Sequence, residues 1–558
     1  MTSGNASSAH SENWDAIVIG AGLGGLSSAA YLAASGKRTL LLERYAVLGG
    51  SSHVFRRKKK WEFDCGVHYI GDCGPGSTIA TLMQGLGLDD RIHWLQLDRD
   101  GFDTIIGPDL ELRTPSCWDQ YLENLLLAFP GEARGLRFYI SVMRRIANSL
   151  DPSVSFSSKT EMAKFAARCG WAAPWIMMPH ASLLAACRLR PRTIMTLSLQ
   201  DAATATTPDA APVMMRASFL HDFINGGAWY PKGGGQMIAA GFAEVIRSHG
   251  GEIRTQTHVD RILIEGGAVK NWKMSHPLIN GFFGIEIDIS KTPNTNYYVV
   301  PNWDSTSSLW NLHRSFSRRV TRASGRDPID WAQDFARNQP AFVQCSTRRD
   351  LDNHRSAPSG HAAIEAQTLA PSDPNLWGFN GYDVATGAYR RDSRYQEIKE
   401  IISAGLLDRI EQAYPGASAK VAWNEQGTPA SQERFTYTSQ GAAFGIEPRI
   451  TQFGPFRPGV NTVIKGLFMA GASTTWGPGT AGAMLSGLYA ASAITGRNLQ
   501  EEIRSGKVLA DPTRFSQWGP DFDPLTACRL KGQKKQTRQE AEAEERENSA
   551  PLKRAVKA

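Results

Sequence analysis

Residues 14–50, WDAIVIGAGLGGLSSAAYLAASGKRTLLLERYAVLGG, predict a strand, a tight turn, a helix and a second strand in that order. The short apolar run 16–19 is rich in β-branched residues, as expected of a strand that is buried on both faces. Residues 26–35 are small and apolar enough for a helix, which Gly36 would end. A second apolar run at 39–42 predicts the next strand, so we expect an α/β unit at this end of the chain.

The turn after the first strand carries the spacing G-x-G-x-x-G, with Gly20, Gly22 and Gly25 at its key positions and Gly24 between them. The first glycine permits the tight bend, the second lets the backbone approach a pyrophosphate, and the third lets the helix pack closely on the strand. The N–H groups at the start of the helix would face the phosphates. Glu43 ends the second strand, 23 residues after Gly20, where its carboxylate can accept the hydroxyls of a ribose. The stretch therefore predicts a dinucleotide-binding site.

The choice of cofactor depends on Glu43 and on the residues that follow it. An acid at this position disfavours a ribose phosphate, which argues against NADP and leaves NAD and FAD. The glycine pair Gly49 and Gly50 comes soon afterwards, and this arrangement resembles the extended FAD fingerprint of the glutathione-reductase and amine-oxidase superfamily. The resemblance implies that FAD is the cofactor.

The 558 residues are enough for roughly two to four domain-sized units and a large core. Seven cysteines are scattered without C-x-x-C pairs or zinc-ligand spacing, which predicts free thiols, a reducing compartment and no structural metal. Basic residues gather at 56–60, 188–192 and 314–326. These clusters are either solvated surface or sites that attract anionic lipid headgroups. Because no recognised reader motif accompanies them, we expect no nucleic-acid partner.

An apolar segment rich in Trp and Met, WAAPWIMMPHASLLAA, spans 171–186. It is too short, and too often interrupted by proline, to cross a bilayer. It is either a buried helix of a substrate domain or an interfacial segment that dips into one leaflet. Neither a signal peptide in 1–13 nor an apolar run of about 18 residues is visible, so the sequence predicts a cytoplasmic protein, and the interfacial interpretation of 171–186 adds a peripheral membrane contact.

Two further glycine-rich blocks occur, at 226–235 and 466–482. The second predicts a strand at 467–470 and a helix at 483–495, whose N-terminal dipole can face an anionic or polarised group. Apolar spacing elsewhere predicts helices at 122–129, 136–150, 237–248 and 396–413, strands at 282–287 and 297–300, and two short strands within 252–264.

These patterns divide the chain into alternating pieces of two domains. A disordered N-terminus, 1–13, and a partly disordered C-terminal extension, 501–558, flank them. We assign 14–75, 226–270 and 441–500 to the FAD-binding domain, and 76–225, which is helical, and 271–440 to the substrate domain.

Four separated blocks resemble the phytoene desaturase, carotenoid isomerase and all-trans-retinol saturase group of FAD-dependent oxidoreductases. They are 15–50, WEFDCGVHYIGD at 61–72, GGAWYPKGGGQMIAAGFAEVIRSHGGEIRTQTHVDRI at 226–262, and GLFMAGASTTWGPGTAGAMLSGLYAA at 466–491. The piece FDCGVHYIGD is most similar to the retinol-saturase branch, and order and spacing agree over most of 14–500. The resemblance implies an α/β fold: a Rossmann-type FAD-binding domain, like that of glutathione reductase and the amine oxidases, with an interleaved α+β substrate domain.

The resemblance also implies roles for individual residues. His68 and Tyr69 would lie near the flavin ring, as catalytic residues that move a proton or tune the flavin, and Trp476 would wall the substrate pocket. The other interpretation of His68 is a hydrogen-bonded core histidine. The stretch after Val269 is shorter than in the family, which implies a changed substrate pocket. The residues expected to bind FAD are Gly20, Gly22, Gly24, Gly25, Glu43, Arg44, Gly49, Gly50 and Ser51 along its ADP half, the backbone of Val259 at adenine, and Gly471, Ala472, Gly479, Thr480 and Ala481 at the ribityl chain and flavin ring.

The function implied by the resemblance is FAD-dependent oxidoreduction of C–C double bonds in a hydrophobic polyene, such as a carotenoid or a retinoid. A polyene has no charge and no acidic hydrogen, so the protein would bury and orient it while hydride passes to or from the flavin. Desaturation, saturation and isomerisation all remain open, as does the electron partner. The alternatives are an amine oxidase or carotenoid ketolase of the same fold, and a flavin- or lipid-binding protein without turnover.

Overall fold

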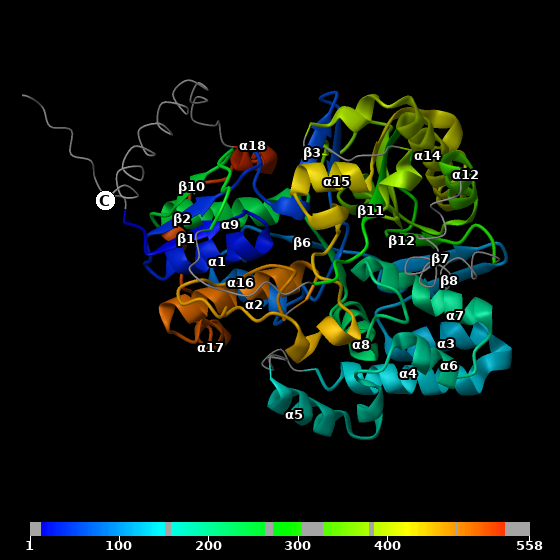
Figure 1. The fold of residues 1–558 in the computed structure, drawn as a ribbon, viewed down its shortest axis with the longest axis horizontal. Coiled ribbons are helices and arrows are strands. Elements are labelled where there is room, and N and C mark those ends of the chain that lie inside the picture. Colours follow the sequence, from blue (N-terminus) through cyan, green and yellow to red (C-terminus); the bar gives the residue numbers. More distant parts are fainter. Residues whose placement is uncertain are drawn as a thin grey trace, which may run out of the picture.

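The computed structural model describes residues 13–150, 158–262, 272–303, 327–378, 384, 386–475 and 477–529. Figure 1 shows the N-terminal strands and helices on one side of the molecule and a large sheet with two covering helices on the other. A helical region lies beside that sheet. Residues 1–12 of the N-terminus predicted to be disordered, the distal part of the C-terminal extension, the first residues after Val269, where the chain is expected to be shortened, and the third basic cluster lie outside the described residues.

The N-terminal α/β unit forms as the sequence predicts. β1 (Ala16–Ile19) and β2 (Thr39–Leu42) are adjacent parallel strands, and α1 (Leu23–Ala34) connects them. β10 (Glu252–Arg254) pairs in parallel with the other edge of β2, which gives the order β1-β2-β10. The helix starts at Leu23 instead of residue 26 because the end of the glycine turn already has helical geometry.

One face of β1 is more exposed than the sequence predicts. Ala16 and Val18 pack against the core under α1, whereas Ile17 and Ile19 are 56% and 51% exposed. Successive side chains of a strand point to opposite faces of the sheet, and it is Ala16 and Val18 that point to the helix side. The expectation of a strand buried on both faces is therefore wrong for the face that carries Ile17 and Ile19.

The core of this unit joins segments that are far apart in sequence. α1 packs against both α9 (Gln236–Ser248) and α16 (Thr480–Thr495). The approach of α1 and α16 is close, because a Cβ atom on Gly487 would lie 2.4 Å from the carbonyl oxygen of Gly24. Three short helices complete the core: α2 (Thr78–Gly85), α17 (Leu499–Arg504) and α18 (Pro524–Cys528).

The strand predicted at 467–470 does not form, and this prediction is wrong. Phe468 makes only an isolated antiparallel bridge with Asn461, and the N–H of Met469 donates to the carbonyl of Val460. The segment thus bonds to its own neighbouring loop instead of joining the parallel sheet. Of the two short strands predicted within 252–264, β10 forms, and the residues from 255 to 262 are not in a strand.

The other half of the molecule is built on a seven-stranded mixed sheet. α12 (Pro328–Asn338) and α14 (Ser393–Ala413) cover one of its faces. β12 and β7 pair in parallel, and the other neighbours pair antiparallel. The strand order is β15 (Val421–Gly427), β11 (Leu278–Ile285), β14 (Ala362–Leu369), β13 (Ala341–Cys345), β12 (Asn296–Val299), β7 (Asp103–Gly107) and β8 (Leu110–Thr114).

A helical region packs against the opposite face of this sheet, where its core includes Ile105 of β7 and Tyr298 of β12. The helices predicted at 122–129 and 136–150 are α3 and α4. The Trp- and Met-rich segment 171–186 forms a 3₁₀ turn, Gly170–Trp175, followed by a short helix. Within the residues that the structure describes, no helix has both the length and the apolar character to cross a membrane. The helices are α3 (Trp118–Ala128), α4 (Ala133–Ala147), α5 (Lys159–Cys169), α6 (His180–Ala186), α7 (Pro191–Ser198) and α8 (Val213–Leu220).

Two small sheets connect the halves. β3 (Val54–Arg57) pairs with β4 (Trp61–Asp64), and β9 (Ala228–Pro231) pairs with both β5 (Ile70–Gly71) and β6 (Trp94–Gln96). His68 and Tyr69 lie in the short connection between β4 and β5. The N–H of Asp64 donates to Oε1 of Glu365 on β14 at 3.2 Å, so this connection is held directly against the large sheet.

Candidate active site

The glycines of the first turn divide into packed and open positions. A Cβ atom on Gly25 would lie 2.0 Å from the carbonyl oxygen of Gly20, and one on Gly24 would lie 2.5 Å from the nitrogen of Gly471. A Cβ atom on Gly50 would lie 2.8 Å from Cα of Gly22. In contrast, a Cβ atom on Gly20 or Gly22 would meet nothing within 4 Å. Gly24, Gly25 and Gly50 therefore allow neighbouring backbone segments to approach closely. Gly20 and Gly22 leave the space beside the turn that a bound pyrophosphate requires.

Glu43 hydrogen-bonds to the backbone beside this space. Its Oε2 accepts the N–H of Ala21 at 2.6 Å, and its Oε1 accepts the N–H of Tyr45 at 2.6 Å. A carboxylate oxygen has more than one acceptor position, so both oxygens can still accept a ribose hydroxyl. The N–H of Thr257 donates to the Glu43 carbonyl at 2.9 Å, which brings the chain just before Val259 alongside the acid. This location is compatible with the adenine contact expected of Val259.

Arg44 contacts the residues at the end of a later helix. Its guanidinium lies 3.2 Å from the ring centre of Tyr437, and its NH2 group donates to the carbonyl of Phe435 at 3.1 Å. Both partners lie at the end of α15 (Pro429–Thr436). A cation over an aromatic ring is a favourable contact. Arg44 therefore joins the α/β unit to α15 in this structure.

The C-terminal glycine block lies against the first turn. Gly471 has φ +106° and Gly479 has φ +104°, left-handed conformations that favour glycine, and a Cβ atom on either would meet nothing within 4 Å. Thr480 begins α16, so its N-terminal N–H groups and positive dipole end face this open space. The carbonyl of Ala472 accepts a hydrogen bond from Arg457 at 2.7 Å. Trp476 lies outside the described residues. Together, the two glycine blocks fit a dinucleotide cofactor.

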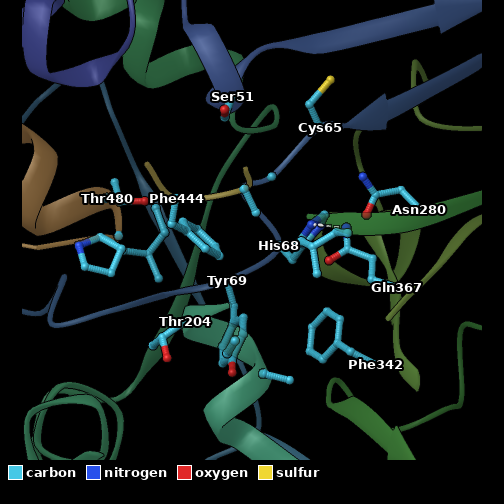
Figure 2. A pocket seen from close by; sticks show the side chains of 18 of the residues that line it. Ser51, Cys65, His68, Tyr69, Thr204, Asn280, Phe342, Gln367, Phe444 and Thr480 are labelled. Atoms are coloured by element: carbon cyan, nitrogen blue, oxygen red, sulfur yellow. Dashed lines mark hydrogen bonds between the residues drawn. The ribbon is translucent and has the colours of Figure 1, made fainter. Parts of the chain in front are cut away.

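We call the two glycine blocks together the cofactor cradle. A cavity of about 580 Å³ is lined at one end by Ser51 and by residues 477–482 of this cradle, and it continues into the space between the large sheet and the helical region. In Figure 2, Ser51 and Thr480 lie on one side of it, and Asn280, Gln367 and Phe342 lie on the other. His68 and Tyr69 lie between these two sides in this view. Apolar side chains line much of the sheet and helix side, among them Leu199, Met214, Met215, Phe219, Phe223 and Phe342.

His68 is buried against polar groups of β14. Its Nε2 lies 2.6 Å from the side-chain amide nitrogen of Gln367, the contact drawn as a dashed line in Figure 2. Its Nδ1 lies 3.3 Å from Oε2 of Glu365. Burial, with a further effect from Arg349, lowers the pKa of His68 to about 3. The ring is therefore a neutral imidazole at ordinary pH.

Tyr69 is held by a second buried carboxyl group. Its hydroxyl donates to Oδ2 of Asp103 at 3.4 Å and lies 3.4 Å from the hydroxyl of Tyr298. Asp103 also accepts from the amides of Asn296, at 2.8 Å, and Gln200, at 2.5 Å. Burial raises the pKa of Asp103 to about 6, and burial also raises the pKa of Tyr69 well above its usual value. Tyr69 therefore carries its proton and acts as a hydrogen-bond donor.

The sequence analysis missed the residues that the large sheet adds to this site. Glu365 and Gln367 of β14, Asn280 of β11 and Asp103 of β7 all stand on the sheet face that is turned away from α12 and α14. Asn280 is directly opposite Gln367 in the antiparallel register. One local signal was present: β14 reads AAIEAQTL, in which two polar residues at alternate positions interrupt an apolar strand.

A buried carboxyl group beneath the site makes stability depend on pH. Asp64 accepts from the hydroxyl of Tyr230 at 2.5 Å and from the N–H of Gly235 at 3.0 Å, yet burial raises its pKa from 3.8 to about 7. The folded chain therefore binds this proton more tightly than the unfolded chain. The resulting stability is present below about pH 4 and is lost as pH rises through about 7.

We expect Asp64→Asn to reduce the fall in unfolding free energy between pH 4.5 and pH 7.5 by an amount on the order of a few kcal/mol. Urea unfolding at the two pH values measures the difference. The exposed Asp89 offers a matched control, because Asp89→Asn removes a carboxylate from the surface. An Asp64→Asn variant with the same pH dependence as the parent protein would contradict the assignment of the raised pKa to this carboxyl group.

Comparisons with known proteins agree with this architecture. A family model described as an NAD(P)-binding Rossmann-like domain matches residues 18–86. The chain is 23% identical over 546 residues to an all-trans-retinol 13,14-reductase of Danio rerio, with 88% of each chain covered. It is 26% identical over 512 residues to the chloroplastic prolycopene isomerase 1 of an Oncidium hybrid cultivar, with 87% of this chain and 84% of the relative covered.

Among solved structures, the cyclohexylamine oxidase from Brevibacterium oxydans superposes with a TM-score of 0.52 at 15% identity, covering 87% of this chain and 99% of the oxidase. At that identity the likeness concerns the fold alone. It confirms the α/β fold with a Rossmann-type domain that the sequence predicts. The order of the blocks, the shared length of the relatives and the fold agree, and they support the resemblance of this chain to the retinol saturase and carotenoid isomerase family of oxidoreductases.

Proposed function

We propose that this protein is an FAD-dependent oxidoreductase that acts on the C–C double bonds of a hydrophobic polyene, carotenoid- or retinoid-like. The observation that carries the proposal is the continuous cavity, which runs from Ser51 and the start of α16 to the apolar wall at Phe342 and Phe223. A cofactor in the glycine cradle would present its reactive end to that wall. The relatives named as a retinol reductase and a prolycopene isomerase support the same class of substrate.

The chain's own residues would bind the cofactor and orient the polyene. Bound FAD supplies hydride exchange at its ring nitrogen. Gly20, Gly22 and the start of α16 would hold its phosphates and ring edge through backbone N–H groups. The rings of Tyr69 and Phe223 lie 4.5 Å apart, and together with Phe342 they form a rigid aromatic wall that orients a flat conjugated chain and excludes water.

His68 is the residue proposed to move a proton at the substrate carbon. It lines the cavity between the cofactor cradle and the apolar wall, and its neutral ring can give a proton at one nitrogen while it takes one at the other. Tyr69 would serve as a fixed donor, because Asp103 and Tyr298 hold its hydroxyl. Because a polyene is uncharged, the protein can contribute to the reaction only by burying the substrate, by orienting it and by moving a proton.

The first experiment is an absorption spectrum of the purified protein, followed by heat release and identification of the small molecules that come off. We expect released FAD. Oxidised and reduced holoenzyme are each mixed anaerobically with retinoids and with carotenoids, and chromatography identifies the products. Reoxidation of the reduced flavin indicates saturation, reduction of the oxidised flavin indicates desaturation, and a new isomer without net change in the flavin indicates isomerisation. A colourless protein that takes up no added FAD would refute the proposal. Oxygen consumption with simple amines would favour an amine oxidase, and oxygen in the product a ketolase.

A surface patch on the helical region supports a membrane contact through which such a substrate could enter. Trp171 is 56% exposed, and its ring centre lies 6.4 Å from that of Phe138, which is 37% exposed. Met178 of the same segment is also exposed, and Arg137 next to Phe138 points to solvent. Exposed aromatic rings beside basic side chains are typical of proteins that lie on anionic lipid surfaces.

The basic clusters contribute less to such a contact than their number of charges indicates. Arg192 pairs with Asp109 at 2.7 Å, and Arg57 pairs with Glu425 at 2.6 Å. Their charges are therefore largely neutralised within the protein, which favours the interpretation of these two residues as ordinary surface.

We expect the protein to float with anionic liposomes, and the double variant Phe138→Ser, Trp171→Ser to bind them at least about 100-fold more weakly, because each of the two rings loses about 1.5–3 kcal/mol of burial. A flotation assay measures the bound fraction. The double variant Leu127→Ser, Val508→Ser serves as a control, because it removes apolar side chains exposed elsewhere on the surface. If the parent protein ignores anionic liposomes, the membrane contact is excluded without consequence for the chemistry.

A further inference from the structure

His68 and Glu365 face each other through two atoms that lack other partners. Nδ1 of His68 lies 3.3 Å from Oε2 of Glu365, and neither atom has a hydrogen-bond partner among the described residues. Glu365 is fully buried behind the cavity wall, whereas His68 lines the cavity. An unpaired buried polar atom is costly, so whichever of the two groups carries a proton donates it to the other.

The ring of His68 connects this pair to the cavity. Its Nε2 lies 2.6 Å from the amide of Gln367, which itself lines the cavity (Figure 2). A glutamine amide has both a donor and an acceptor, and a half-turn exchanges them. Gln367 therefore fits Nε2 with or without its proton. Nδ1 faces a buried carboxyl group, and Nε2 faces a polar side chain of the cavity wall.

We propose that Glu365 is a positioning residue that shares one proton with His68, so that Nε2 of His68 gives a proton to the substrate or takes one from it. This inference rests on the proposed function. In the saturating direction one C=C π bond breaks and two C–H bonds form. The hydride and its electron pair come from the reduced flavin dinucleotide, which is oxidised, and the proton comes from Nε2. The proton of Glu365 moves to Nδ1, which leaves a neutral imidazole and a buried carboxylate. Water in the cavity then returns a proton to Nε2, and Nδ1 gives its proton back to Glu365; desaturation runs in reverse.

The electrostatic surroundings keep this pair neutral. Burial raises the pKa of Glu365 well above its usual value, and the neighbouring Asp64 adds to the rise. His68 stays uncharged for the reason given above. As pH rises through the raised pKa of Glu365, the pair loses its shared proton, so the saturating reaction slows. The titratable and charged groups that face the pair from neighbouring elements are Asp64, Cys65, Tyr230, Cys345 and Arg349.

The kinetic test is Glu365→Gln in the FAD-loaded full-length protein. The reduced holoenzyme is mixed anaerobically with a retinoid, and its reoxidation is followed between pH 5 and pH 9. We expect a rate about 100-fold lower at pH 7, and no decline toward alkaline pH, because the variant has no carboxyl proton to lose. Glu447→Gln is the matched control, since Glu447 is equally buried but pairs with Lys273 and Arg449. An unchanged pH profile in Glu365→Gln overturns the inference.

A second test requires no substrate. Nitrogen NMR of ¹⁵N-histidine-labelled protein resolves the ring atoms, and among the 12 histidines the signal of His68 is the one missing from His68→Gln. We expect its Nδ1 resonance to move in Glu365→Gln and to stay in place in Glu447→Gln. An unmoved resonance refutes the shared proton. If the parent protein oxidises or reduces no polyene, the proposed function fails, and this measurement still decides whether the pair exists.

Discussion

Gly22→Ala should remove the cofactor without unfolding the protein. A Cβ atom on Gly22 would meet no protein atom within 4 Å, and its backbone has φ −69°, which alanine adopts without strain. The added methyl group would stand in the open space above the turn, where a pyrophosphate must approach the backbone. We expect FAD affinity to fall on the order of 100-fold or more, which corresponds to about 2.7 kcal/mol, while stability without FAD changes by about 1 kcal/mol at most.

Two other glycines make this prediction specific. A Cβ atom on Gly25 would lie 2.0 Å from the carbonyl oxygen of Gly20, so Gly25→Ala should destabilise the fold itself, by about 1–3 kcal/mol. Gly519 is exposed and its added Cβ atom would meet nothing within 4 Å, so Gly519→Ala should change neither property. FAD titration by fluorescence and thermal unfolding of the apoprotein separate the three outcomes. If Gly22→Ala binds FAD with the affinity of the parent protein, the pyrophosphate does not bind at this turn.

His68→Gln should leave the cofactor bound and remove most of the chemistry. Loss of a group that moves a proton in the transition state typically costs 10²–10⁴-fold, so we expect reoxidation of the reduced holoenzyme by a polyene to slow by about 1000-fold. Glutamine retains polar atoms toward Gln367 and Glu365 but cannot relay a proton between two ring nitrogens. Stopped-flow absorbance of the flavin measures the rate, and the static spectrum reports the amount bound.

The same variant tests the alternative that His68 is only a hydrogen-bonded core residue. In that case His68→Gln would lower the melting temperature while the rate per bound flavin stayed near that of the parent protein. His354→Gln replaces an exposed histidine and should affect neither quantity. A normal rate in stable, FAD-loaded His68→Gln would therefore move the proton transfer to another group, with Tyr69 and its partner Asp103 as the next candidates.

The features that could be predicted from the sequence are those encoded by neighbouring residues. β1, α1 and β2 follow from apolar runs separated by a glycine turn, and Glu43 ends β2 close to that turn, as its spacing predicts. Hydrogen bonds within a helix and the steric demands of glycine act over a few residues. A motif that depends on such short-range interactions can therefore be recognised from one stretch of sequence.

The features that could not be predicted depend on which distant segments meet. The apolar run 467–470 carries a strand pattern, but it hydrogen-bonds to Val460 and Asn461 of the preceding loop instead of joining the sheet. Ile17 and Ile19 are apolar, yet the helices pack on the other face of β1 and leave them half exposed. Periodicity states which residues can share a face, and only the packing of other elements decides whether that face is covered.

By itself the sequence determined the glycine-rich strand–turn–helix unit, the resemblance to a family and the position of His68 in a motif of that resemblance. The tertiary structure alone decided what His68 faces. Glu365 and Gln367 lie about 300 residues farther along the chain, on a strand whose register against β11 and β13 turns them toward the β4–β5 connection. A buried carboxyl group acquires its raised pKa from exclusion of water, and that exclusion exists only once the sheet, the helices and the connection have packed together.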